Sequence, residues 1–131
     1  MKERNYMNKR LNMLLECESI ISSTENIEEL VAEDYLDNQE FFIVRQNAEK
    51  IEEIIAGNYN IDDDEPLLSD EIEEIEELRI EIYQAAKYIS EDYLEDKNDD
   101  YNNLDDLEKE VVNEFKYIRN STDNISNLLT N

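Results

Sequence analysis

The sequence contains no histidine or tryptophan, and it has only one cysteine, one glycine and one proline in 131 residues. Without histidine, neither His-containing zinc sites nor Ser-His and Cys-His catalytic pairs can form. One cysteine cannot form an internal disulfide, and one glycine is too few for a glycine-rich phosphate-binding loop. We therefore expect a protein that is not an enzyme and that has no metal site and no cofactor.

The lone cysteine, Cys17, stands among leucine and isoleucine residues. This setting favours a small core residue over a reactive thiol, which needs a basic or helix N-terminal environment. The basic N-terminal segment is not followed by the apolar stretch of a signal peptide, because Glu16 and Glu18 interrupt it. No stretch reaches the roughly 18 apolar residues of a membrane span. The sequence thus predicts a cytoplasmic protein without membrane contact.

Positive charge is scarce, because 12 Lys and Arg residues stand against 36 Asp and Glu residues and the formal net charge is −24. Ile, Leu, Val and Phe still make up 35 residues, more than the roughly one fifth below which highly charged chains usually stay disordered. A hydrophobic core is therefore possible. The length is typical of one compact domain, so we predict a single acidic domain over residues 1–131.

Apolar residues recur at helical spacing through most of the chain, without strand-like alternation of useful length. The sequence therefore predicts an all-α fold, a helical bundle of four to five helices. The expected helices span about 3–22, 26–35, 37–56, 69–93 and 104–129. Ser22, Ser23 and Thr24 predict a turn or cap after the first helix, because their hydroxyls compete for backbone hydrogen bonds. No internal repeat is evident.

The fourth expected helix has the most regular pattern. Ser69 is its predicted cap, and Asp70 and Glu71 in the first turn interact favourably with the helix dipole. Its apolar positions advance by three and four residues through Leu68, Ile72, Ile75, Leu78, Ile82, Ala85, Ala86, Ile89 and Tyr93. The opposite face of this helix is therefore expected to face solvent.

The last expected helix has a nearly heptad pattern, in which Leu104, Val111, Ile118 and Ile125 are each seven residues apart. Such spacing keeps one apolar seam facing a partner helix. Because the other helices also have apolar faces, packing within the bundle is favoured over a free coiled coil.

Negative charge is concentrated in the middle of the chain, where residues 62–100 hold 17 acidic and 3 basic side chains. An ordinary surface helix would intersperse Lys and Arg to form pairs, whereas like charges three or four residues apart each cost roughly 0.2–0.5 kcal/mol. A merely solvated acidic face is the simpler interpretation, but a charge of −24 penalises the compact state. We favour a functional anionic surface, with the candidate partner-binding residues Asp62, Asp63, Asp64, Glu65, Asp70, Glu73, Glu74, Glu77 and Glu81.

A calcium site in this region is an alternative interpretation. Asn60, Asp62 and Asp64, with Glu71 at the twelfth position, resemble the spacing of an EF-hand loop. Glu65 stands where that loop requires glycine, however, so the sharp turn would be strained. The same segment is better interpreted as an acidic connector, and pairs such as Asp105 and Glu108 lack any accompanying nucleophile for acid-base chemistry.

Eight tyrosines are present, and most are expected to be half-buried with the hydroxyl toward water. In an alternative interpretation, Tyr59, Tyr88 or Tyr101 anchors an interface among the acidic residues.

In composition, and in acidic runs such as Asp62 to Glu65 and Glu71 to Glu81, the chain resembles the phage-encoded nucleic-acid mimics that act as anti-CRISPR and anti-restriction inhibitors. The resemblance implies an inhibitor that blocks the basic groove of a Cas effector or restriction enzyme, in the host cytoplasm. Direct binding to nucleic acid is not expected, because phosphates would be repelled.

Two other functions stay open. An immunity or antitoxin protein that neutralises a basic toxin would use the same physical device. A helical adaptor would instead recruit another helix through the seam from Leu104 to Leu129, and its binding would survive high salt. An apolar stripe left uncovered could also close a homodimer.

Overall fold

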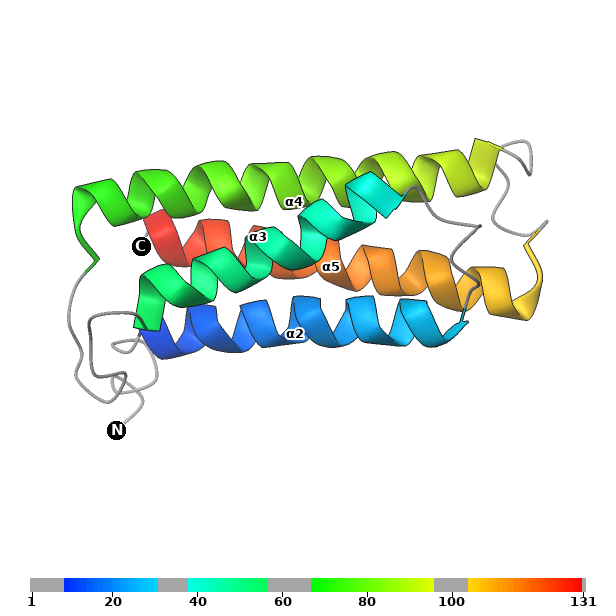
Figure 1. Cartoon of the computed structure of the whole chain (residues 1–131), viewed down its shortest axis with the longest axis horizontal. Helices are drawn as coiled ribbons and strands as arrows, with labels where there is room; N and C mark the ends of the chain where they lie inside the picture. The colour runs from blue at the N-terminus through cyan, green and yellow to red at the C-terminus, as the bar shows by residue number, and fades with distance from the viewer. Residues whose placement is uncertain (1–8, 31–37, 57–66, 96–103, 131) are drawn as a thin grey trace.

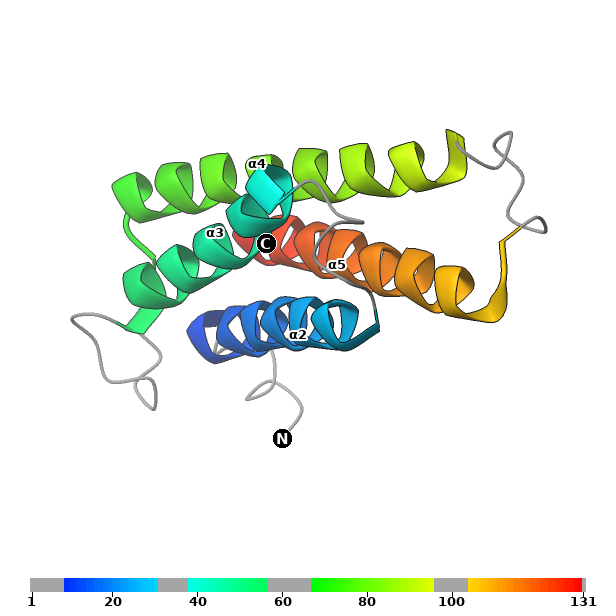
Figure 2. The ribbon, with the colours of Figure 1, turned by 45° about the vertical axis from the view of Figure 1, so that its right-hand side comes forward.

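The computed structural model describes residues 9–30, 38–56, 67–95 and 104–130. These ranges contain four α-helices and no strand: α2 (Lys9–Leu30), α3 (Asn38–Ala56), α4 (Ser69–Glu95) and α5 (Asp106–Thr130). The helices form an antiparallel bundle in which α2 and α4 each pack against both α3 and α5 (Figure 1). Figure 2 shows α2 and α4 on opposite sides of the bundle. The predicted all-α bundle is confirmed, with four helices in the described ranges.

Helix α2 is continuous through Ser22, Ser23 and Thr24, so the predicted turn at these residues is wrong. Ser23 and Thr24 are buried, and the Thr24 hydroxyl donates a hydrogen bond to the Ile21 carbonyl at 2.6 Å. The hydroxyl is thus satisfied within the helix and does not compete with its continuation. Residues 9–22 of the first expected helix and Asn26 to Leu30 of the second belong to one element, while residues 3–8 and 31–35 lie outside the described ranges.

Helices α2 and α5 share a short sequence repeat that the sequence analysis missed. The pattern Ile-x-x-Ser-Thr-acid-Asn-Ile-x-x-Leu occurs at residues 20–30 and again at 118–128. In both copies the Ser, the Thr and both Ile residues are buried. The Thr hydroxyl also makes the same bond in each copy, because Thr122 donates to the Arg119 carbonyl at 2.6 Å, as Thr24 does to Ile21.

Reciprocal hydrogen bonds join the two copies of this repeat. Asn26 donates to Glu114 at 3.3 Å, and Asn124 donates to Glu16 at 3.2 Å. Asn26 and Asn124 occupy equivalent positions, as do Glu16 and Glu114. The α2–α5 pair is therefore antiparallel with an approximate twofold relation, and this explains the register in which the first and last helices pack.

The core contains most of the apolar positions that the periodicity predicts, but Leu68 of the expected ladder, which stands just before α4, is 56% exposed. The heptad residues are all buried: Leu104, just before α5, and Val111, Ile118 and Ile125 within it. Phe115 of α5 packs edge-on against Phe41 of α3, with ring centroids 6.4 Å apart. The seam of α5 is thus occupied within the bundle, as expected.

One charged side chain, Arg10, is also buried, with 1% of its surface exposed. Its Nη1 donates to the Ile55 carbonyl near the end of α3 at 3.0 Å, and its Nη2 donates to the Glu71 carboxylate of α4 at 2.8 Å. Arg10 therefore ties three helices together at one end of the bundle. Arg10, one of the basic residues near the start of the chain, thus neutralises an acidic side chain of the bundle.

Candidate functional site

Helix α4 carries most of the negative charge of the bundle. Ten acidic side chains stand against two basic ones in Ser69–Glu95, whereas each of the other three helices has four or five acidic and two or three basic residues. The candidate surface is therefore a property of one helix.

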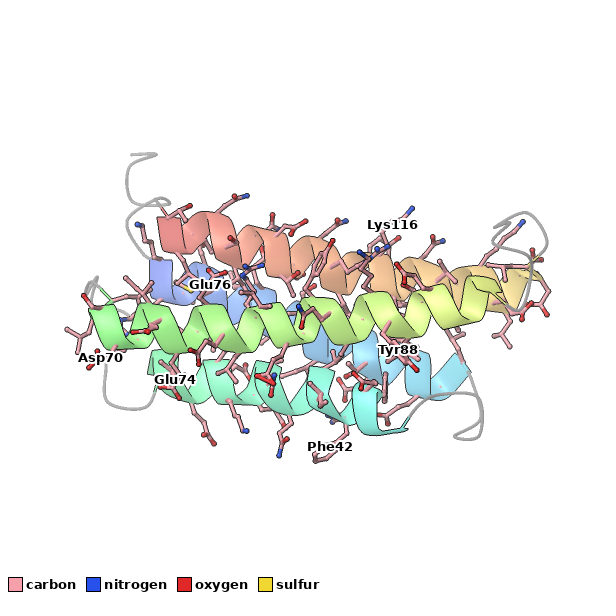
Figure 3. The ribbon with its side chains drawn as sticks, turned by 90° about the horizontal axis from the view of Figure 1, so that it is seen from above. Phe42, Asp70, Glu74, Glu76, Tyr88 and Lys116 are labelled. Carbon is pink, nitrogen blue, oxygen red and sulfur yellow. The ribbon has the colours of Figure 1, made fainter. Side chains whose placement is uncertain are left out.

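The buried face of α4 fixes which of its residues face solvent. Ile75, Ile82 and Ile89 are seven residues apart and buried, so the opposite face of the helix points outward. Five of the candidate residues lie on that outward face and are exposed. We call them the acidic ridge: Asp70, Glu73, Glu74, Glu77 and Glu81. Figure 3 looks down on α4 and labels Asp70 and Glu74.

The start of α4, beside the ridge, is held by side-chain hydrogen bonds. The first helical hydrogen bond runs from the Ile72 amide to the Leu68 carbonyl at 2.9 Å, which makes Leu68 the capping residue. The Glu71 carboxylate accepts the Leu68 amide, also at 2.9 Å, as in half of a capping box. The predicted cap at Ser69 is thus wrong by one residue. Glu71 is positioned to accept the Leu68 amide because Arg10 donates a hydrogen bond to the same carboxylate oxygen.

The ridge carboxylates are not neutralised by any cation of the described ranges. The ion pairs of α4 join Arg79 to Glu76, Lys87 to Glu91 and Arg10 of α2 to Glu71, and none of these residues belongs to the ridge. Among the residues that the structure describes, no Lys or Arg lies within ion-pair distance of a ridge carboxylate. The five charges are therefore available to a partner.

The ridge ends in the middle of α4. Beyond Glu81 the outward face continues with Gln84, Lys87 and Tyr88, all exposed. Tyr88 is 56% exposed and stands seven residues after Glu81, a spacing that places both on the same face of the helix. It matches the alternative in which a tyrosine accompanies the acidic residues, while Tyr59 and Tyr101 lie outside the described residues.

The other four candidate residues cannot be placed. Asp62, Asp63, Asp64 and Glu65 all lie outside the described residues. The structure thus brings together the candidates from Asp70 to Glu81, and the rest of the predicted patch stays a prediction.

The carboxylates that resemble a calcium ligand or an acid-base pair in the sequence have structural roles. Glu71, the twelfth position of the calcium-loop pattern, already accepts hydrogen bonds from Arg10 and Leu68. Asp105 and Glu108 form a reciprocal capping box at the start of α5, with distances of 2.8 and 3.1 Å. Within the four described ranges, no group of three or more potential metal-ligating side chains is found.

Cys17 is confirmed as a core residue, since it is fully buried in α2. The pKa of its thiol is raised to about 12, mainly by burial and to a lesser extent by the nearby carboxylates of Glu52, Glu16 and Glu18. The thiol is thus protonated at neutral pH and is shielded from reagents.

Sequence reasoning missed a second acidic group, which lies between α2 and α3. The pKa of Glu52 is raised, first by burial and then by the carboxylates of Glu18 and Glu49. Glu49 and Glu52 are three residues apart on α3, and their spacing signals a common side. The approach of Glu18 from α2 has no signal in the sequence, because it depends on how the two helices pack.

Comparisons of the chain with protein-family models, curated proteins and solved structures found no match. Within the described ranges, none of the helices combines the length and apolar character that crossing a bilayer requires.

Proposed function

We propose that this protein is a non-enzymatic inhibitor that presents the acidic ridge in place of a nucleic-acid backbone and blocks the basic groove of a DNA- or RNA-binding enzyme. The observation that carries the proposal is the ridge itself. Its five carboxylates are exposed on one helix face, and no cation of the described chain neutralises them. By resemblance to acidic phage-encoded inhibitors, the target class is a Cas effector or a restriction enzyme.

The spacing of the ridge supports the comparison with a phosphate backbone. From Asp70 to Glu81 the helix rises about 16 Å, so five carboxylates give one negative charge per roughly 3 to 4 Å. One DNA strand carries a phosphate per roughly 3.4 Å of axis. A groove lined by Lys and Arg residues at phosphate spacing would therefore meet a similar linear charge density.

The energetic effect of the ridge on the fold supports a binding role over simple solvation. Five pairs of ridge residues lie three or four positions apart. At roughly 0.2–0.5 kcal/mol for each like-charge pair, their repulsion costs about 1 to 2.5 kcal/mol in total. The bundle would be more stable with mixed charges at these positions, and a cationic partner relieves this repulsion on binding.

The adaptor alternative receives less support. The four heptad residues of its recruiting seam are buried, and the most exposed of them is Leu104, just before α5, at 4%. These residues pack inside the bundle and present no apolar row to another helix. An immunity or antitoxin protein would use the same ridge. The identity of the captured partner distinguishes that role from mimicry of nucleic acid in an enzyme's groove.

The proposal is tested by capturing partners from the natural host on the immobilised protein at low salt. Partners held through the ridge should elute as salt rises, because screening weakens exposed charge interactions. They should also be displaced by added duplex DNA or RNA, which competes for the same groove. A captured protein that nucleic acid fails to displace argues against mimicry and favours the antitoxin alternative.

A further inference from the structure

A second surface feature lies on α3, away from the acidic ridge. Phe42 is 61% exposed, the most exposed of the large hydrophobic side chains that the structure describes. Figure 3 shows it projecting outward from α3, at the edge of the bundle opposite Lys116 of α5. Its neighbour Phe41 is partly buried and packs against Phe115. Adjacent residues of a helix point in different directions, so with Phe41 turned inward Phe42 faces solvent.

Phe42 borders a surface pocket of about 360 Å³ between α2 and α3. The pocket is lined by Glu28 of α2 and by Phe41, Phe42, Arg45, Gln46 and Glu49 of α3. An ion pair of 2.9 Å between Arg45 and Glu28 crosses from one helix to the other at this pocket. Because an apolar cavity of about 150 Å³ is enough to hold a benzene molecule, this pocket has room for one aromatic side chain.

The charge around the pocket is negative. Arg45 is already paired with Glu28, whereas Glu49 is exposed and has no ion pair with a described residue. Glu53 lies four residues after Glu49 on the same outward side and is also exposed. The second acidic group, in which Glu18 and Glu49 act on Glu52, adjoins this row. Lys50 is exposed too and stands three residues before Glu53, but no ion pair joins it to an acidic residue of the described ranges.

We propose that the pocket beside Phe42 is a second docking surface, which takes an aromatic side chain from a Lys- or Arg-rich segment of the partner. The inference rests on the proposed function, since it assumes a cationic partner, and it adds the chemistry of a second contact. The apolar wall formed by Phe41 and Phe42 receives the ring, and Glu49 and Glu53 pair with flanking cations. Aromatic anchors in such pockets commonly dominate binding energy, whereas exposed charges mainly steer the encounter.

The absence of tryptophan from this chain makes a direct test possible. The probe is the peptide Lys-Lys-Trp-Lys-Lys, titrated with the full chain, because its indole is then the sole tryptophan fluorophore. We expect its emission to shift to the blue as the indole enters the apolar pocket. The peptide Glu-Glu-Trp-Glu-Glu should show no shift, because its charges oppose Glu49 and Glu53.

Matched variants locate the contact. Phe42→Ala should weaken binding of the basic peptide about tenfold and remove most of the blue shift. Leu107→Ala serves as the control, since it removes an apolar side chain that is 45% exposed on α5. That variant should behave as wild type. Both side chains are exposed, so the helical circular dichroism of each variant should match that of the parent.

The outcome separates this pocket from the ridge. Reversal of Glu73, Glu74 and Glu77 to Lys should leave the blue shift at saturation intact, although the lower negative charge weakens the overall attraction. If the ridge variant loses the blue shift while Phe42→Ala keeps it, the pocket proposal is overturned and the ridge proposal stands. A shift that depends on Phe42, in a protein whose ridge captures no nucleic-acid-binding partner, supports the pocket and counts against the proposed function. No shift with the wild-type chain overturns the pocket outright.

Discussion

The guanidinium of Arg10 and the carboxylate of Glu71 meet at 2.8 Å, although the two residues are 61 positions apart. The same Glu71 oxygen accepts the Leu68 amide at the start of α4. The second guanidinium nitrogen of Arg10 donates to the Ile55 carbonyl of α3. Three helices are thus joined at the end of the bundle where the acidic ridge begins, so this contact positions the first residues of the ridge.

Replacement of Arg10 by Met should therefore be strongly destabilising. It leaves the Glu71 carboxylate and the Ile55 carbonyl without their buried donor, and breaking a buried pair in this way costs about 3–5 kcal/mol. Urea denaturation should show that loss in the free energy of unfolding. Glu71→Gln keeps an acceptor for both donors and should cost less, about 1–2 kcal/mol. Equal stability of Arg10→Met and wild type would contradict the described role of this contact.

The capping box at the start of α5 makes a smaller contribution. Asp105→Ala removes the acceptor of the Glu108 amide and should lower the free energy of unfolding by about 1 kcal/mol. Asp106→Ala, one residue further along and exposed, is the matched control and should cost only a few tenths of that. A control that loses as much stability as Asp105→Ala would show that charge near the helix N-terminus matters, and not the cap.

Glu52 predicts a specific dependence of stability on pH. Its pKa in the folded state is raised, first by burial and then by Glu18 and Glu49, so the folded protein binds this proton more tightly than the unfolded chain. The stabilising contribution of protonated Glu52 is therefore complete below the ordinary pKa of 4.5 and is lost as pH rises through the raised value. Glu52→Gln should melt at a higher temperature than wild type at pH 7, and the gain should vanish below pH 4.5. A variant that melts at or below the wild-type temperature at pH 7 would contradict this account.

Cys17 should resist alkylation while the protein is folded. The thiol is fully buried, and its pKa is raised to about 12, so both access and thiolate formation are suppressed. Mass spectrometry after treatment with iodoacetamide at pH 8 should show unmodified protein, and the same treatment in urea should label the chain once. Rapid labelling of the folded protein would show that α2 opens locally.

The periodic features of this fold could be predicted from sequence, and the contacts between distant residues could not. The heptad of α5 and the apolar ladder of α4 fix a buried face, and the acidic ridge follows because it occupies the opposite face. The continuity of α2 at Ser23 and Thr24 depends on burial against other helices, which no local rule supplies. The sequence likewise does not show which of Phe41 and Phe42 turns outward. That choice depends on Phe115, whose ring packs against the ring of Phe41 inside the bundle.

The most direct test of the central claim compares two charge-reversal variants of equal net charge in binding to the captured host protein. Glu73, Glu74 and Glu77 become Lys in the first variant. Glu25, Glu110 and Asp123, which are exposed on α2 and α5, become Lys in the control. The ridge variant should melt at or above the wild-type temperature, because three of the five like-charge pairs of the ridge become attractive. It should lose the partner, while the control retains it. Full retention of the partner by a folded ridge variant would contradict the proposal that the ridge is the binding surface.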